Sequence, residues 1–203
     1  MDYQTIKFEL NDNIAVITLD RPDVMNAMST QMRAEIQHAV KEGGRTARCV
    51  VLTGAGRAFC SGQDLGDNSS NSFDLEQTLR DEYEPMLRAI YDCPVPTIAA
   101  VNGAAAGAGA NLALAFDVVI ATGGTGLTGR DGTPEAFRAV FDKEIEGFGE
   151  IFRLVSFDKI GTSTIQSRAV GGVAKGTYMF ALPGSSSACR DGWDEILRYQ
   201  LDI

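Results

Sequence analysis

The sequence contains little of the chemistry on which many enzymes depend. Its 203 residues include one histidine, one tryptophan and four cysteines, and no two cysteines follow the Cys-x-x-Cys spacing. The histidine, His38, lies within an expected helix without evident partners, so we expect it to face solvent. The sequence therefore argues against a zinc site built on histidine and against a Ser-His-Asp triad, and we expect no metal site.

Basic charge and long apolar runs are also scarce. The 18 lysines and arginines are outnumbered by 27 acidic residues, which gives a formal net charge of −9. This balance argues against a nucleic-acid partner and against an anionic membrane surface, because both attract basic proteins. The weakly polar stretch 95–122 is interrupted by Asn102, Asn111 and Asp117. We interpret it as strand–helix–strand and not as a membrane span.

Two further absences bear on the compartment. The N-terminal segment lacks the basic and apolar regions of a secretory signal peptide. The cysteines are scattered, and three of them stand among apolar neighbours, as buried free thiols do. We therefore expect a cytoplasmic protein with reduced cysteines.

What the sequence does contain is typical of a folded protein. Apolar residues make up 44% and charged residues 22%, which excludes disordered, collagen-like and mucin-like chains. The length suits one domain of ordinary size or two small ones. Glycine is uneven, with 9 residues in positions 1–122 and 13 in the shorter remainder. The two parts of the chain thus differ in character.

Hydrophobic patterning predicts alternating strands and helices, and hence a layered α/β architecture. In the first part we expect a hairpin of residues 5–10 and 14–19, then a helix capped by Ser29 and ended by Gly43-Gly44. The other elements expected there are a strand at 49–52, a loop at 53–67, a helix at 73–91, a strand at 97–101, a helix at 105–115 and a strand at 118–121.

The second part repeats the alternation of strands and helices. We expect a glycine loop at 123–130, followed by a helix with Thr133 as its N-cap and Pro134 at its first position. The elements expected after it are a helix near 164–173, a strand at 177–182, a turn at 183–187 and a helix at 189–200.

Two stretches of small residues in the first part follow strand ends and leave backbone N–H groups uncovered. They are residues 57–65 (RAFCSGQDL) and 102–111 (NGAAAGAGAN), and the second leads into a helix N-terminus with partial positive charge. Two such N–H groups converging on one point would polarise a thioester carbonyl and stabilise an enolate oxyanion. Alternatively, the small residues only allow tight packing of helix against strand. Periodicity leaves both interpretations open.

Residues 1–122 resemble the crotonase family, which is the enoyl-CoA hydratase/isomerase superfamily. The likeness runs through LDRPDVMNAM (19–28), VVLTGAGRAFCSGQDL (50–65) and CPVPTIAAVNGAAAGAGANLALAFDVVIAT (93–122). The resemblance implies a β-hairpin/βαβ fold for this part and a coenzyme A thioester as substrate.

The resemblance also implies a set of site residues. The oxyanion-hole N–H groups would come from Gln63 and Ala108, which makes these the candidate catalytic residues. The residues that would line the substrate groove are Asn26, Ala27, Met28, Ala58, Cys60, Gly62, Asp64, Leu65 and Gly107.

The chain departs from the crotonase family at its catalytic acids. The first catalytic glutamate aligns with Asn111, which cannot act as a general base. The second belongs to a GLIPDxGG segment that does not follow residue 122, and the C-terminal helices that close the acyl pocket are missing. Asp64 we expect to fix its loop. We therefore expect acyl-CoA binding with impaired hydratase or isomerase chemistry.

A second candidate site begins where the first part ends. Residues 121–134 place glycine and polar backbone units between a strand and a helix, an arrangement that suits phosphate or a similar oxyanion. It is neither a Walker loop nor the dinucleotide-binding GxGxxG pattern. Residues 183–189 (PGSSSAC) repeat the arrangement after another strand. Two such loops would lie at one sheet edge, where α/β proteins bind ligands; the alternative is a connection without a ligand.

Residues 117–203 resemble the MoaB/Mog family of molybdenum-cofactor biosynthesis proteins. The likeness runs through TGGTGLTGRD (122–131), residues 133–185 and CRDGWDEILRYQLD (189–202). It implies the C-terminal half of a three-layer αβα fold, with Asp131 as a catalytic candidate that positions magnesium or a nucleotide phosphate. It implies molybdopterin contacts from Gly123, Gly124, Thr125, Gly126, Ser163, Pro183, Gly184 and Ser185.

We interpret the chain as a chimera joined within residues 117–122, because the first half of the MoaB/Mog pattern is absent as well. Its parts would be an acyl-CoA-binding part at 1–122 and a molybdopterin-binding part at 123–203. Three functions stay open: a crotonase-like enzyme, a molybdopterin-binding protein resembling adenylyltransferases that use Mg-ATP, and an inactive fusion or scaffold. Both families form trimers or hexamers, so we expect a homo-oligomer where those interfaces survive, without a tightly bound cofactor.

Overall fold

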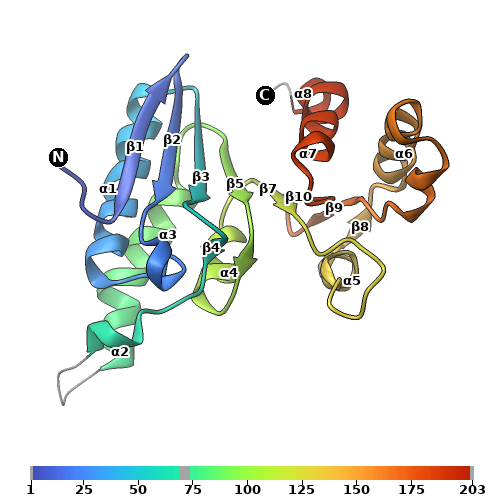
Figure 1. Ribbon diagram of the computed structural model, residues 1–203. Helices are drawn as coiled ribbons and strands as arrows, with labels where there is room; N and C mark the ends of the chain where they lie inside the picture. The colour runs from blue at the N-terminus through green and yellow to red at the C-terminus, as the bar shows by residue number, and fades with distance from the viewer. Residues whose placement is uncertain (1, 69–73, 202–203) are drawn as a thin grey trace. The chain divides into compact units, whose positions relative to one another are not determined.

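The computed structural model describes residues 2–68 and 74–201, which fall into two units, residues 1–118 and 119–203. Both units contain strands and helices, so the predicted α/β class is confirmed (Figure 1). Within the described ranges, no helix is long and apolar enough to cross a membrane.

In the first unit, β1, β2, β3 and β5 lie side by side in that order. The predicted hairpin is confirmed, because β1 and β2 are antiparallel and the turn residues Asp12 and Asn13 both have positive φ. β3 pairs in parallel with β2 and with β5, and a separate parallel pair, β4–β6, includes part of the expected loop. The strands are β1 (Ile6–Asn11), β2 (Ile14–Leu19), β3 (Cys49–Gly54), β4 (Ala58–Cys60), β5 (Thr97–Val101) and β6 (Ala104–Ala105).

Helix α1 (Thr30–Thr46) contacts β1, β2 and β3 and covers them with an apolar stripe (Figure 1). Met32, Ile36 and Val40 on this stripe are fully buried. Ser29 caps the helix as predicted, since its Oγ accepts a hydrogen bond from the N–H of Met32 at 3.2 Å. The spacing of apolar residues and the Ser29 cap therefore both favour this helix.

The predicted end of this helix at Gly43-Gly44 is wrong. The helix continues past both glycines, and a Cβ on Gly43 would lie 2.9 Å from Cγ2 of Val50 and 3.0 Å from Cβ of Ala15. Gly43 is thus a close-packing position inside the helix and not a stop signal.

The other helices of the first unit follow the predictions in part. The helix expected at 73–91 is helical from residue 75 onward, while Phe73 lies outside the described residues. The helix expected at 105–115 is shorter, because its first residue belongs to β6. The elements are α2 (Leu75–Thr78), a π-turn (Leu79–Tyr83), α3 (Glu84–Tyr91), α4 (Ala108–Ala113) and 3-10 turns at Pro22–Val24 and Leu65–Asn68.

In the second unit the strand order is β7, β10, β9, β8. β9 and β10 form an antiparallel hairpin whose turn residues, Lys175 and Gly176, both have positive φ. The strands predicted at 118–121 and 177–182 are confirmed. The strands are β7 (Val118–Thr122), β8 (Lys143–Glu144), β9 (Val170–Ala174) and β10 (Thr177–Leu182). The helices are α5 (Thr133–Val140), α6 (Glu146–Ile160), a 3-10 turn (Gly161–Gln166), α7 (Ser186–Gly192), a π-turn (Trp193–Leu197) and α8 (Arg198–Gln200).

The helix predicted near 164–173 is wrong, because β9 occupies its second half and the helix of this region, α6, ends before it. Within this strand, Gly171 pairs with Phe180 of β10. A Cβ there would lie 2.8 Å from the ring of Phe180 and 3.1 Å from the ring of Phe148, and both rings are buried. The glycine therefore makes room for an aromatic cluster in the core of this unit.

Two helix starts in the second unit also differ from prediction. Thr133 is the first residue of α5 and not its N-cap; Gly132 holds the cap position without a side-chain hydrogen bond. The last helix begins earlier than expected, because Ser185 caps α7 by accepting a hydrogen bond from the N–H of Ala188 at 3.2 Å.

Gly171→Ala should destabilise the second unit by about 1–3 kcal/mol, because its methyl group would overlap two buried rings. Gly147→Ala, in α6, is the matched control. Nothing lies within 4 Å of its Cβ position, so helix propensity should raise the stability by roughly 0.5–1 kcal/mol. Denaturant titrations measure both free energies of unfolding, and a Gly171→Ala variant as stable as wild type would contradict the packing role.

Candidate functional site

The Gln63 backbone lies beside Met28, and the pairing directs its N–H group. The N–H of Met28 donates to the carbonyl of Gly62 at 2.8 Å, and the N–H of Asp64 donates to the carbonyl of Met28 at 3.1 Å. In a parallel bridge, the residue between these two points its own N–H to the opposite side. Among the described residues, no backbone carbonyl accepts a hydrogen bond from the N–H of Gln63.

The start of α4 lies against this loop. Gly62 has φ +106°, and a Cβ on it would lie 2.9 Å from the carbonyl oxygen of Ala106 and 3.4 Å from the nitrogen of Ala108. A Cβ on Gly109 would lie 2.2 Å from the carbonyl oxygen of Cys60. Ala108 is the first residue of α4, so its N–H has no acceptor within the helix. The structure thus packs the start of α4, with Ala108, against the loop that carries Gln63.

Most residues of the predicted substrate groove are buried, and the side chain of Asn26 ties loops together. Asn26 accepts a hydrogen bond from the N–H of Arg21 at 2.9 Å and donates to the carbonyls of Ala55 at 3.0 Å and Ala58 at 2.9 Å. Burial raises the pKa of the Cys60 thiol, which donates to the Asn26 carbonyl at 3.1 Å. Exposed members of the set are Leu65 and Gly107, and buried ones are Asn26, Ala27, Met28, Ala58, Cys60 and Gly62.

Asp64 makes the contacts expected of a loop-fixing residue. Its Oδ2 pairs with Nη1 of Arg21 at 2.7 Å, and its Oδ1 accepts a hydrogen bond from the N–H of Gly66 at 3.0 Å. The hydrogen bond from Arg21 lowers the pKa of Asp64. The same arginine nitrogen donates to the carbonyl of Ala27 at 2.6 Å. Asp64 is therefore an engaged carboxylate and not a free base.

A buried polar cluster contacts the Gln63 side chain, and the sequence patterns did not reveal it. Nη1 of Arg33 donates to Oε1 of Gln63 at 3.1 Å, and the Tyr83 hydroxyl donates to the same oxygen. Arg33 is 1% exposed and forms an ion pair with Glu82. Burial raises the pKa of Tyr83. One signal was available: Arg33 follows Met32 on the apolar side of α1, where a charge requires partners.

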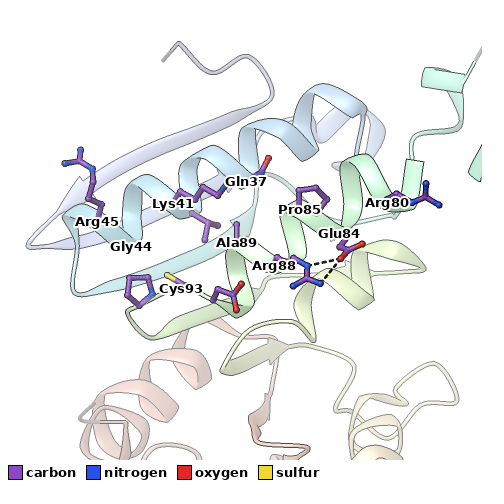
Figure 2. Close-up of a pocket in the computed structure, with 13 residues that line it drawn as sticks. Gln37, Lys41, Gly44, Arg45, Arg80, Glu84, Pro85, Arg88, Ala89 and Cys93 are labelled. Atoms are coloured by element: carbon purple, nitrogen blue, oxygen red, sulfur yellow. Dashed lines mark hydrogen bonds and ion pairs between the residues drawn. The ribbon is translucent and has the colours of Figure 1, made fainter. Parts of the chain in front are cut away.

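Two grooves lie near these elements. One of about 660 Å³ is lined by Asn111 and Tyr83 and by the leucines Leu79, Leu87 and Leu114. Another of about 810 Å³ lies between α1 and α3 and contains none of the predicted residues (Figure 2). The arginines at its rim are compensated by acidic partners, in the pairs Arg45–Glu42, Arg80–Glu76 and Arg88–Glu84.

In the second unit, one cavity of about 430 Å³ gathers the predicted residues. The glycine loop after β7 and the turn after β10 meet there, since the N–H of Gly123 donates to the carbonyl of Leu182 at 3.0 Å. A Cβ on Gly184 would lie 3.1 Å from the Cα of Gly123. Predicted residues lining the cavity are Gly123, Gly124, Thr125, Gly126, Asp131, Ser163, Pro183, Gly184 and Ser185.

Asp131 and Arg168 hold the glycine loop in shape. Oδ2 of Asp131 accepts hydrogen bonds from Oγ1 of Thr128 at 2.5 Å and from its N–H at 3.0 Å, and the side-chain bond is the main cause that lowers the pKa of Asp131. Arg168 donates to the carbonyls of Thr125 at 3.2 Å and Asp131 at 2.5 Å. Sequence reasoning missed Arg168, because no local pattern connects it with the loop.

The structure describes the single histidine and all four cysteines. His38 is exposed, and its Nδ1 lies 2.9 Å from the hydroxyl oxygen of Tyr3. All four cysteines are free thiols. In the part of the chain that the structure describes, no group of three or more histidine, cysteine, aspartate or glutamate side chains is arranged to hold a metal ion.

The fold and its candidate sites define an α/β protein with a loop packed against a helix start in one unit and a glycine-loop cavity in the other. The family model described as enoyl-CoA hydratase/isomerase matches residues 9–126, and the one described as probable molybdopterin binding domain matches residues 77–202. The chain belongs to both families and is a chimera of them, as predicted. The two matches overlap between residues 77 and 126.

Individual relatives resemble either part. Over 121 residues the chain is 63% identical to a probable enoyl-CoA hydratase from Rhodobacter capsulatus, covering 60% of this chain and 47% of that protein. Over 85 residues it is 61% identical to molybdenum cofactor biosynthesis protein B from Escherichia coli, covering 42% and 50%. A crystal structure of enoyl-CoA hydratase from Bacillus anthracis aligns with a TM-score of 0.52 and 32% identity. The alignment covers 59% of this chain and 48% of that one. The chain spans about half the length of the curated relatives it matches.

Thr128→Val should raise the pKa of Asp131 toward its ordinary value, because the hydroxyl bond that favours the carboxylate is lost. Because the folded-state pKa is depressed, the stability contributed by this carboxylate is present above its unfolded pKa and is lost as pH falls through the folded value. Carboxyl chemical shifts followed by NMR across the acid range measure the pKa. The pKa of Asp64 in the other unit should stay unchanged, and an unaltered Asp131 would contradict the assignment.

Proposed function

We propose that the first part, residues 1–122, binds a coenzyme A thioester and polarises its carbonyl group. The observation that supports this function is the packing of the Gln63 loop against the start of α4, where the Ala108 N–H has no acceptor within the helix. In this proposal the N–H groups of Gln63 and Ala108 point to one place, where two backbone donors stabilise a developing oxyanion. The groove lined by Asn111 and three leucines offers an apolar surface for the acyl chain.

The proposal includes weak hydratase or isomerase chemistry, because groups for proton transfer are engaged or replaced. An amide stands at Asn111, where a general base would be needed. The carboxylate of Asp64 is paired with Arg21, and that of Glu82 is paired with Arg33. Polarisation of the carbonyl without an available base favours binding over turnover.

Ala108→Pro tests the oxyanion donor with little risk to the fold, because proline is well tolerated in the first turn of a helix. The loss of one hydrogen bond costs about 1 kcal/mol, so the Kd of the thioester should rise roughly fivefold, while the Kd of free coenzyme A should not change. Isothermal titration with butyryl-CoA and with coenzyme A measures both constants. Ala108→Ser keeps the N–H and serves as control; equal thioester affinity in the two variants would refute the donor.

Molybdopterin binding by residues 123–203 is a second candidate function, favoured by the cavity that gathers nine predicted residues. The chemistry of the cavity suits an oxygen-rich, phosphate-bearing ligand, because backbone units of the glycine loop and hydroxyl groups line it. Ser167 lines it too, and its Oγ is buried without a hydrogen-bond partner in the described part of the chain. In this proposal the glycine loop and residues 183–185 hold the pterin, while Asp131 faces magnesium or the phosphates of ATP.

Gly124→Ala should weaken molybdopterin binding about tenfold, because φ is +65° there and a left-handed alanine costs about 1–2 kcal/mol. Its Cβ would also lie 2.3 Å from Oγ1 of Thr133. Gly129→Ala, in the same loop, is the matched control, since nothing lies within 4 Å of its Cβ position. Fluorescence titration with molybdopterin measures the Kd; equal affinities in both variants would contradict a ligand role for the loop.

The proposal also includes the compartment and the oligomeric state of the protein. The free state of all four cysteines and the burial that raises their pKa values fit a reducing cytoplasm. A homo-oligomer, a trimer or a hexamer, is part of the same proposal, and gel filtration with light scattering determines it. Absence of saturable binding to both the thioester and molybdopterin would instead support an inactive fusion or scaffold.

A further inference from the structure

One nitrogen of Arg33 touches both partners of the bridge that orients the Gln63 N–H. Nη1 donates to the carbonyl of Met28 at 2.7 Å and to Oε1 of Gln63 at 3.1 Å. The same Met28 carbonyl accepts the hydrogen bond from the N–H of Asp64. The backbone pairing and the side chain of Gln63 therefore depend on the position of a single guanidinium group.

The guanidinium is itself held on all sides. Its Nε donates to Glu82 at 2.9 Å, Nη2 contacts the same carboxylate, and Nη2 also donates to Oγ1 of Thr30 at 3.1 Å. The ring of Tyr83 lies beneath it, with its centroid 4.7 Å from Cζ. A π-turn presents the adjacent residues Glu82 and Tyr83 to the one arginine, and such turns are frequent at functional sites.

The amide of Gln63 shows that the cluster does not simply maximise stability. Its Oε1 accepts from both Arg33 and Tyr83, which fixes the orientation of the amide, while Nε2 is buried without a partner among the described residues. A buried donor without an acceptor costs free energy. This cost in free energy falls on Gln63, a residue of the proposed oxyanion hole. The arrangement therefore fits a positioning role.

We infer that Arg33 is a positioning residue for carbonyl polarisation: it holds the Met28–Gln63 bridge and with it the direction of the Gln63 N–H. This inference rests on the proposed acyl-CoA function. Arginine is required, because three nitrogens in a rigid fork reach Glu82, Met28 and Gln63 at once, whereas the single ammonium of lysine cannot span them.

The test uses the full chain and cinnamoyl-CoA, whose conjugated absorption band moves to longer wavelength when its carbonyl is polarised. One titration yields both the band shift and the Kd. Arg33→Lys keeps the charge beside Glu82, and Arg33→Met removes it; both should lose most of the band shift. The Kd should change less, because the whole coenzyme A moiety contributes to it. Arg45→Met, an exposed position on the same helix, should retain the full shift.

The outcomes separate the inference from the proposed function. A full band shift in a folded Arg33→Lys variant overturns the positioning role, and thermal unfolding shows that the variant is folded. Should Arg33→Met fail to fold, the lysine variant still decides. Absence of any band shift in the wild type overturns the acyl-CoA function itself and the inference with it.

Discussion

Close approach of backbone to backbone, at places where no Cβ fits, governs both sites of this protein. A Cβ on Gly109 would lie 2.2 Å from the carbonyl oxygen of Cys60, and one on Gly184 would lie 3.1 Å from the Cα of Gly123. At the first place the start of α4 reaches the Gln63 loop, and at the second the two loops of the cavity meet. A side chain at either glycine would push these backbone segments apart.

Side chains around the sites act mainly on the backbone. Asn26 and Asp64 tie loops together in the first unit, and Asp131 and Arg168 shape the glycine loop in the second. Arg33 joins α1 to the Gln63 loop through hydrogen bonds to the Met28 carbonyl and the Gln63 side chain, and it forms an ion pair with Glu82. Backbone N–H groups have no rotamers of their own. The geometry of a site built from them therefore depends on the side chains that hold the backbone in place.

Each unit has its own core and its own candidate site. In the first, α1 covers β1–β3; in the second, the rings of Phe148 and Phe180 meet with centroids 4.9 Å apart. The segments of each candidate site come from within one unit, and in the first unit position 111 is an asparagine, whose amide cannot act as a general base.

The sequence by itself determined what depends on neighbours along the chain: the first hairpin with its Asp12-Asn13 turn, the Ser29 cap, and the ordered motifs that place the chain in two families. Only the tertiary structure decided that Gly43 packs inside a helix, that Gly171 lies in a strand, and that Arg33 contacts Gln63. The reason is physical. Alternation and caps act over a few residues along the chain, whereas the effect of a missing Cβ or of a buried charge depends on atoms that the fold brings close.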